Sequence, residues 1–520
     1  MCPCCDTALA MTAATPSQQG FSPLAKLVEE AKRTVDGAPP PHPDEPDDDD
    51  APLYAARRKI YPQRVTGTYR RIKWALLFVT LGIYYLLPFV RWDRGPNAPD
   101  QAVLIDLPGR RFYFFFIEIW PQEAYYLTGL LIVAAMVLFL MNAVAGRVWC
   151  GYLCPQTVWT DLFLAIERWT EGDRREHLLR DRQPWSLDRL ARSGLKHFLW
   201  LVVAWWTGGA WVLYFADAPT LVRDLATFQA PVAAYVFIAM LTFTTYALAG
   251  WMREQVCVYM CPWPRIQAAL TDEYALNVTY RYDRGEPRAS LKKAATLHEH
   301  AQPAGDCIDC LQCVHVCPTG VDIRGGSNLG CIQCGLCIDA CDAVMAKIGR
   351  PARLIAYDTD VNIKRRLQGQ QPFYRILRSR TVLYAVIIAL VGAVMLYTLT
   401  TRRHEAVSVL HDRNPVFVRL SDGAVRNAYT VRILNKTHET QSFVLKISGL
   451  AEADVAVIGS EARRGSDPVI EVGPDQSREM RVLVTTHHAL GPDASLPLTF
   501  TIVPDGGGAT ASAADHFLGP

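Results

Sequence analysis

Apolar residues are gathered into long stretches and are not spread evenly along the chain. Five stretches stand out, at residues 74–90, 124–145, 195–215, 231–251 and 381–400. Each approaches the about 20 residues that a helix needs to cross about 30 Å of hydrocarbon. The pattern therefore predicts an α-helical membrane bundle of about five spans, and so a multidomain membrane protein.

Positive charge predicts the orientation of these spans. Lys and Arg cluster from Arg57 to Lys73, before the first span, and from Arg168 to Lys196, between the second and third, whereas the loop between the third and fourth spans carries only Arg223. Short cytoplasmic loops are enriched in these residues. We therefore expect a multi-pass protein of the bacterial inner membrane with its N-terminus inside, its C-terminus outside and residues 252–380 inserted on the cytoplasmic side.

The first 55 residues have no apolar period, are rich in Pro and contain the run Asp47 to Asp50. This composition predicts a disordered cytoplasmic tail. The tail lacks the apolar stretch of a secretory signal, so we expect no cleaved leader. Its thiols, Cys2, Cys4 and Cys5, could bind a soft metal, but no further ligand is nearby and incidental thiols are the preferred interpretation. Their role stays open.

After the fifth span the pattern changes to short β-rich runs separated by turn residues. The runs cover residues 416–420, 429–434, 443–447, 480–484 and 496–502. This spacing predicts an all-β, immunoglobulin-like sandwich, placed in the periplasm by the predicted orientation. The aromatic stretch Phe112 to Trp120 is too short to span and is expected at the outer interface. The predicted regions are a tail (1–55), a membrane domain (56–270), a cytoplasmic region (271–378) with a ferredoxin domain at about 300–350, a fifth span (379–402) and the sandwich (403–520).

Composition agrees with a modular chain. At 520 residues it is longer than the ~250 to 300 residues at which single cores stop growing. Lys and Arg number 53 against 51 Asp and Glu, a formal charge of +2, so no global charge favours nucleic acid as a partner. The sequence has neither a GxGxxG string after a strand nor a Walker A string, so electrons must come from another molecule.

Eight cysteines form two copies of the pattern C-x2-C-x2-C-x3-C. The first copy is Cys307, Cys310, Cys313 and Cys317, and the second is Cys331, Cys334, Cys337 and Cys341. In bacterial ferredoxins the fourth cysteine of each run ligates the other cluster. This spacing predicts one [4Fe-4S] cluster on Cys307, Cys310, Cys313 and Cys341 and a second on Cys331, Cys334, Cys337 and Cys317. Structural zinc is a minor alternative that predicts a colourless protein.

A second cysteine motif, CxYxCP, occurs twice at the edge of the predicted membrane domain. It holds Cys150 and Cys154 in the first copy and Cys257 and Cys261 in the second, with 107 residues between equivalent positions. Each copy follows a span that runs inward, so the halves form a parallel repeat. The four thiols could bind Cu(I), with Met260 as a possible thioether ligand, or shuttle electrons through a disulfide. That these cysteines are merely small packing residues is the less favoured interpretation, because the pair occurs twice at the same spacing.

Five strings carry a family resemblance: GRVWCGYLCPQTVWTDLF (146–163), REQVCVYMCPWPRIQ (253–267), RGEPR (284–288), GDCIDCLQCVHVCPTGVDIR (305–324) and CIQCGLCIDACDAVM (331–345). From about residue 55 to its end the chain resembles the FixG/CcoG/RdxA family, membrane ferredoxin-like accessory proteins of cbb-type cytochrome c oxidase. The resemblance implies reduction of Cu(II) to Cu(I) for oxidase maturation. It assigns the eight ferredoxin cysteines to two clusters and the four membrane cysteines to copper. Trp263-Pro264 departs from the Tyr-Ala expected there and could shift the following helix.

The expected partners are the oxidase and its copper-delivery factors, membrane lipid, and a cytoplasmic or quinol electron donor. Two other functions stay open. A ferredoxin-type quinol dehydrogenase would exchange electrons with quinone and would not need the four membrane cysteines. A non-enzymatic assembly scaffold would need its fold and would not need its clusters.

Overall fold

The computed structural model describes residues 59–519 except 96–97, 185, 301–302, 403–404, 438, 451–452, 461–462, 465–466, 475, 489–490, 492–493 and 508–509. The predicted tail, with Cys2, Cys4 and Cys5, lies outside the described residues. The chain divides into two compact units. The first comprises Met1–Leu81, Met136–Gly208 and Ala239–Ala385, and the second comprises Gly82–Ala135, Gly209–Ile238 and Val386–Pro520.

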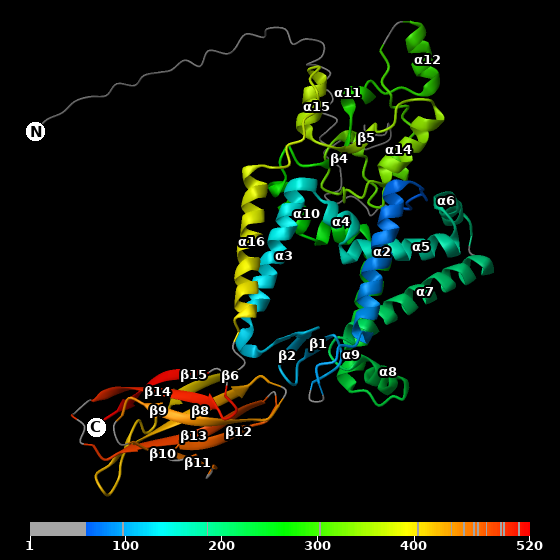
Figure 1. The fold of residues 1–520 in the computed structure, drawn as a ribbon. Coiled ribbons are helices and arrows are strands. Elements are labelled where there is room, and N and C mark those ends of the chain that lie inside the picture. Colours follow the sequence, from blue (N-terminus) through cyan, green and yellow to red (C-terminus); the bar gives the residue numbers. More distant parts are fainter. Residues whose placement is uncertain are drawn as a thin grey trace, which may run out of the picture. The chain divides into compact units, whose positions relative to one another are not determined.

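Four helices in the described part are long and apolar enough to cross a membrane. They are α2 (Thr68–Leu86) with η2 (Leu87–Phe89), α3 (Tyr125–Ala145) with η3 (Pro121–Glu123), α9 (Val232–Thr245) with η4 (Tyr246–Met252), and α16 (Ser379–Thr400) (Figure 1). They match four of the predicted spans. The third predicted span lies in α7 (Leu187–Val212), which is long enough but carries Lys196, His197 and four tryptophans. That α7 crosses the membrane stays a prediction.

Three shorter helices follow α3 and surround the first CxYxCP motif. They are α4 (Val148–Tyr152), α5 (Pro155–Glu171) and α6 (Arg174–Arg182). Pro155 starts α5, where its missing N–H costs nothing, and Gly172 ends it with a φ of 95°. On α5, Phe163 packs on Trp200 of α7 with ring centroids 5.3 Å apart. The first motif is thus held by a helix that is anchored in the core of the first unit.

The predicted cytoplasmic insertion is closed by a two-stranded sheet. Strand β4 (Asn277–Tyr280) pairs antiparallel with β5 (Ile355–Asp358), which brings the two ends of the insertion together. Between the strands lie α11 (Tyr282–Gly285), α12 (Leu291–Glu299), α13 (Gln312–His315), η6 (Ile323–Gly325) and α14 (Leu336–Lys347), and α15 (Asp360–Leu367) follows β5. Val278, Ile338 and Met345 share one buried core with Cys307, Cys313 and Cys341. The cysteines of the insertion are therefore positioned by a small, closed fold.

The second unit begins with a three-stranded sheet, β1 (Val103–Asp106), β2 (Arg111–Phe114) and β3 (Ile117–Ile119). The aromatic stretch from Phe112 to Trp120 falls on β2 and β3, so it is strand and not a helical span. Its place at the outer interface stays a prediction. Helix α8 (Ala218–Ala226) belongs to the same unit. The segment that precedes α8 is joined to the sheet region, because Gln101 Nε2 donates to the Leu213 carbonyl at 2.8 Å.

The C-terminal region is a sandwich of two five-stranded antiparallel sheets, as predicted (Figure 1). One sheet has the order β10-β13-β8-β6, with β7 also paired to β8, and the other has the order β11-β12-β9-β14-β15. The strands are β6 (Glu405–His411), β7 (Val418–Arg419), β8 (Val425–Asn435), β9 (Gln441–Ser448), β10 (Ala453–Val457), β11 (Arg463–Arg464), β12 (Asp467–Val472), β13 (Gln476–Thr486), β14 (Ser495–Pro504) and β15 (Ala511–Leu518). Alternate residues such as Tyr429, Val431 and Ile433 point into the core against Phe443 and Phe500.

Candidate functional site

The first predicted set of cluster ligands gathers in the core of the ferredoxin insertion. Cys307, Cys313 and Cys341 are buried, whereas Cys310 is exposed. Burial raises the pKa of Cys313 and of Cys341 to about 12, and each is raised further by interaction with Cys307. Cys341, from the second run, also interacts with Cys310 of the first. The structure thus places the last cysteine of one run beside the other run.

The second predicted set lines a cavity of its own. Cys317, Cys331, Cys334 and Cys337 all face this cavity, and Cys313 joins its wall. Burial raises the pKa of Cys331 to about 12 and also raises the pKa of Cys334. Hydrogen bonds from backbone N–H groups lower the pKa of both thiols in part. Iron would have to displace the thiol protons, and these N–H groups stabilise the thiolates that result.

The two ferredoxin runs share an unusual backbone. In the first run, Asp309 and Leu311 flank Cys310 with φ values of 56° and 57°. In the second, Gln333 and Gly335 flank Cys334 with φ values of 54° and 73°. Non-glycine residues rarely adopt this left-handed conformation. Its repetition at equivalent positions bends each loop around its cysteines.

The donor chemistry fits two [4Fe-4S] clusters. Among the described residues, the sole group of three His, Cys, Asp or Glu ligand atoms that lie within 4.8 Å of one another contains no cysteine. In this arrangement of side chains no three of the described thiols lie close enough together to share one metal ion. A [4Fe-4S] cubane lies between its four cysteine ligands, each of which binds a different iron, so it accommodates sulfur atoms that are farther apart. The twelve described cysteines are all free.

The four membrane-edge cysteines come from two separate helical turns. Cys150 lies in α4 and Cys154 caps the start of α5, while Cys257 lies in the π-helical turn η5 (Val256–Met260) and Cys261 follows it. Burial raises the pKa of Cys150 to about 11 and that of Cys257 to about 12; interaction with Cys154 and Cys261 raises both. The repeat therefore brings the four thiols into one neighbourhood.

The membrane thiols differ in access to solvent. Cys150, Cys154 and Cys257 are partly buried, whereas Cys261 is exposed. The side chain of Met260 is 55% exposed, so its role as a copper ligand stays a prediction. Among the described residues no three of these sulfurs lie within 4.8 Å of one another. A single copper ion held by three of them would require side-chain movement.

The membrane thiols contact the wall of the second cluster cavity. Cys150 and Cys257 pack against a buried group that contains Ile332, Cys334 and Leu336. Tyr152, the tyrosine of the first motif, donates a hydrogen bond to the Cys334 carbonyl at 2.9 Å. The predicted copper-reactive site and the predicted second cluster site are therefore neighbours within one unit.

A polar network that the motifs did not reveal joins the two sites. The Arg147 N–H donates to Gln333 Oε1 at 2.8 Å, and Arg147 Nε donates to Gln267 Oε1 at 3.2 Å. The same Gln267 oxygen accepts from Cys150 Sγ at 3.4 Å, and Tyr357 donates to the Gln333 carbonyl at 2.5 Å. Residues joined by these hydrogen bonds lie up to 186 positions apart, so spacing in the sequence gave no signal for them.

Gly151 sits where the membrane motif meets the ferredoxin loop. A Cβ atom there would lie 2.8 Å from the Ile332 carbonyl oxygen and 3.0 Å from Cys334 Cα. We therefore expect Gly151→Ala to lower stability by about 1–3 kcal/mol, because backbone must shift to admit the methyl group. Thermal unfolding of the purified protein measures the effect. Gly194→Ala, in open space on α7, is the matched control and should be neutral or slightly stabilising; equal losses in both would contradict this reading.

The second motif is built differently from the first. Its first four residues lie in the π-helical turn η5, and a further π-helical turn, η4, precedes it and ends at Arg253, whose φ is 42°. In the first copy the helix α5 begins at Pro155, but in the second Pro262 is the N-cap and α10 (Trp263–Leu270) begins one residue later. The helix thus begins one residue later in the second copy than in the first, and the effect of Trp263-Pro264 relative to other family members stays a prediction.

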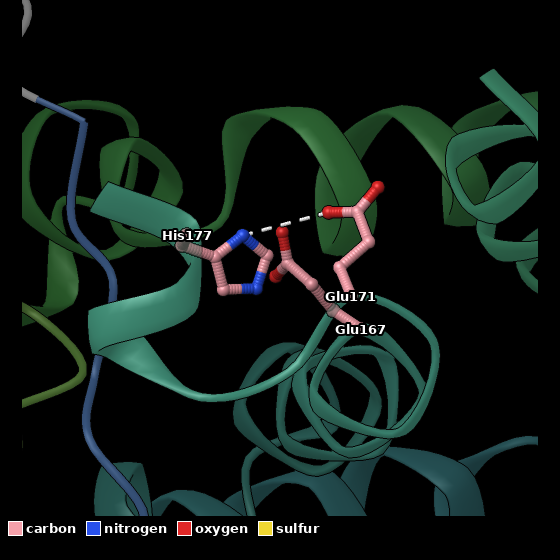
Figure 2. Close-up of side chains that lie close together, drawn as sticks. All are labelled: Glu167, Glu171 and His177. Carbon is pink, nitrogen blue, oxygen red and sulfur yellow. Dashed lines mark ion pairs between the residues drawn. The ribbon is translucent and has the colours of Figure 1, made fainter. Parts of the chain in front are cut away.

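One cluster of ligand-type side chains lies outside the predicted sites. Glu167, Glu171 and His177 approach one another between α5 and α6, with 3.5 Å between His177 Nδ1 and Glu171 Oε2 (Figure 2). Lys196 lies 2.9 Å from Glu171, and Arg253 lies 2.6 Å from Glu167. Because both carboxylates already have a cationic partner, this cluster is better explained as a buried ion-pair network than as a metal centre.

Comparison with family models assigns iron–sulfur chemistry to two segments. Residues 252–360 match a family described as a 4Fe-4S dicluster domain, and residues 127–170 match a 4Fe-4S binding domain. Residues 395–520 match a family described as an IG-like fold at the C-terminal of FixG. The 127–170 segment includes Cys150 and Cys154.

Relatives of high identity span most of the chain. Nitrogen fixation protein FixG of Rhizobium meliloti is 50% identical over 461 residues, which cover 84% of this chain and 87% of that protein. Protein RdxA of Cereibacter sphaeroides is 51% identical over 412 residues, covering 79% and 86%, and Protein RdxB of the same organism is 48% identical over 442 residues, covering 84% and 91%. A crystal structure of a FixG-related protein from Vibrio parahaemolyticus is 23% identical, with a TM-score of 0.19, and covers 22% of this chain and 96% of that one.

Proposed function

Because this chain belongs to the FixG family and is a membrane iron–sulfur redox protein, we propose that it reduces Cu(II) to Cu(I) at Cys150, Cys154, Cys257 and Cys261. One electron converts one Cu(II) to one Cu(I). Clusters held by the eight ferredoxin cysteines would supply such electrons singly. Sulfur ligands retain Cu(I), whereas Cu(II) prefers nitrogen and oxygen, so a thiol site favours the reduced product.

The observation that carries this proposal is the contact between Cys150, Cys257 and the Cys334 segment. A redox centre held by Cys317, Cys331, Cys334 and Cys337 would abut the membrane thiols, with no intervening domain. The exposed Cys261 provides the entrance for copper from solvent, and the partly buried Cys150 and Cys257 provide the end that faces the ferredoxin loop. The side-chain Oε1 of Gln267, which accepts from Cys150 Sγ, would orient that thiol.

The test follows chemically reduced, purified protein after addition of Cu(II). Cluster absorbance and a Cu(I)-specific chelator are monitored together, with a variant in which the four membrane cysteines are serine. We expect cluster oxidation in step with Cu(I) formation in the parent, and at least tenfold slower Cu(I) formation in a variant that keeps both clusters. Copper that leaves the clusters reduced would refute the proposal. Fast oxidation by quinone, unchanged in the variant, would support the quinol dehydrogenase instead.

A second candidate role for the four thiols rests on the family match of residues 127–170. Because that family binds a 4Fe-4S cluster and because no three of these sulfurs are within 4.8 Å, Cys150, Cys154, Cys257 and Cys261 could together hold a third cubane. Iron analysis separates the two roles. Two clusters give about eight iron atoms per chain and three give about twelve. Loss of about four iron atoms in the four-serine variant would support the third cluster.

The wider setting is also part of the proposal. The ferredoxin insertion would face the cytoplasm and the C-terminal sandwich the periplasm, as the charge pattern predicts. A quinol or a cytoplasmic carrier would supply electrons. The cbb-type oxidase and its copper-delivery factors would receive Cu(I). Oxidase assembly supported by folded variants that lack both clusters would favour the scaffold role.

A further inference from the structure

A large, positively charged cavity lies apart from the cysteines, where the start of α2 meets the end of α5. Its volume is about 900 Å³. The lining includes four arginines, two tryptophans and one acid, namely Arg64, Arg70, Arg71, Arg168, Trp74, Trp169 and Asp173. Nothing in the proposed copper chemistry uses this cavity.

The positive charge of the cavity is not balanced by its own acids. Asp173 already caps α6 and accepts the Arg64 N–H at 2.9 Å. Arg70 is paired with the buried Asp161 at 2.9 Å, which Lys73 also approaches at 3.6 Å. Within the described residues, no ion pair neutralises the side chains of Arg64, Arg71 or Arg168.

Arg168 is the most telling of these cations. Its Nε donates to the Leu164 carbonyl at 3.2 Å. Burial and the neighbouring Arg70 lower the pKa of Arg168, and the more distant carboxylates of Asp161, Asp173 and Glu167 offset this only in part. A partly buried guanidinium beside another cation is costly unless an anion is supplied from outside. Arginine binds phosphate oxygens in a two-pronged geometry, which makes phosphate the fitting anion.

The surroundings indicate how such a phosphate would be presented. The first turn of α2 lines the cavity. Helix α2 is one of the four helices that are apolar enough to span the membrane (Figure 1). Trp169 is 74% exposed beside it, and tryptophans are enriched at membrane–water interfaces. Further along α2, Ile72 and Phe78 expose apolar side chains that could contact acyl chains. At the start of α2 the N–H groups of Tyr69 and Arg70 already donate to Asp339, so the arginine side chains are the donors left for an anion.

From this geometry we propose that the cavity binds the phosphate of an anionic phospholipid headgroup. Arg64, Arg71 and Arg168 hold the phosphate, and Trp169 lies at the level of the interface. The bound lipid would hold α2 against α5. It would thereby also stabilise the contact between the start of α2 and Asp339 of α14, the helix that carries ferredoxin cysteines. The ligand class is set by two features together, namely unpaired guanidinium groups and a membrane-facing position.

The test uses the full chain, stripped of lipid in mild detergent. Melting temperature and retained lipid, the latter by native mass spectrometry, are measured with phosphatidylglycerol, phosphatidylcholine or inorganic phosphate. We expect phosphatidylglycerol alone to raise the melting temperature and to remain bound. Arg71→Gln and Arg168→Gln should each weaken its binding roughly tenfold. Arg192→Gln, an exposed arginine paired with Asp188, is the control and should bind as the parent does.

Each other outcome overturns the proposal. Equal binding of phosphatidylcholine would remove the preference for an anionic headgroup. An equal melting shift with inorganic phosphate would assign the cavity to a soluble phosphoanion and not to lipid. Arg71 is exposed, so we expect the Arg71→Gln variant to fold as the parent does. Unchanged lipid binding by this variant would show that the cavity is not the binding site.

Discussion

Cys317→Ser is expected to remove the cluster beside the membrane thiols, although Cys317 belongs to the other ferredoxin run. The reason is its position in the cavity formed by Cys331, Cys334 and Cys337. Iron should fall from about eight to about four atoms per chain, since one of two [4Fe-4S] clusters is lost. Cu(I) formation by the reduced protein should fall at least tenfold, because the remaining cluster would not be held by Cys334, whose segment packs against Cys150 and Cys257.

Cys341→Ser is the matched variant, because Cys341 interacts with Cys307 and Cys310 of the first run. It should lose a similar amount of iron but keep the cluster next to the membrane thiols. After chemical reduction it should still form Cu(I) in a single turnover, with about half the yield. If the effects of Cys317→Ser and Cys341→Ser on copper reduction were exchanged, the crossed assignment of ligands would be wrong.

Asp161→Asn should destabilise the protein by about 3–5 kcal/mol, because it leaves Arg70 and Lys73 buried without their carboxylate. Burial alone would raise the pKa of Asp161, but Lys73, Arg70 and Arg168 lower it overall. A lowered pKa means that this carboxylate contributes stability above its unfolded-state value near 3.9, and that the contribution is lost as pH falls through the folded-state pKa. Thermal melting at neutral pH and between about pH 5 and 3 measures both effects.

Asp188→Asn is the control for this prediction, since Asp188 makes an exposed ion pair with Arg192 one helical turn away. Such surface pairs contribute less than about 1 kcal/mol. The parent should lose stability on acidification more steeply than Asp161→Asn does, whereas Asp188→Asn should follow the parent. Equal melting temperatures for Asp161→Asn and the parent would show that the buried pair is not stabilising.

The parts of the fold with a short sequence period could be predicted, and the parts built from distant contacts could not. Cysteine spacing predicted the two ferredoxin runs, and long apolar stretches predicted α2, α3, α9 and α16. In the sandwich, strands with alternating large apolar residues such as β8 were predicted. The predicted runs left out β6, β10, β11, β12 and β15. The sequence of β15, ASAADHFL, has mostly small and polar residues, and this strand is stabilised by its partner β14.

The connection between the sites could not be found from the sequence. The hydrogen bond from Tyr152 to the Cys334 carbonyl joins residues 182 positions apart, and no local pattern marks either as a partner. The same holds for Arg147 and Gln333. The duplication of CxYxCP indicated that four thiols converge, but the π-helical turns of the second copy have no comparable signature in the spacing of apolar residues.

The ferredoxin insertion uses the two copies of the duplicated motif in different ways. In the first copy Gly151 admits the Cys334 backbone, whereas the corresponding residue of the second, Val258, keeps its side chain near Gly330. The tyrosines have also diverged, since Tyr152 is buried and Tyr259 is 74% exposed. Both copies therefore contact the single insertion, but through different residues, so the insertion breaks the symmetry of the repeat: the first copy packs closely through Gly151 and Tyr152, and the second leaves Tyr259 exposed.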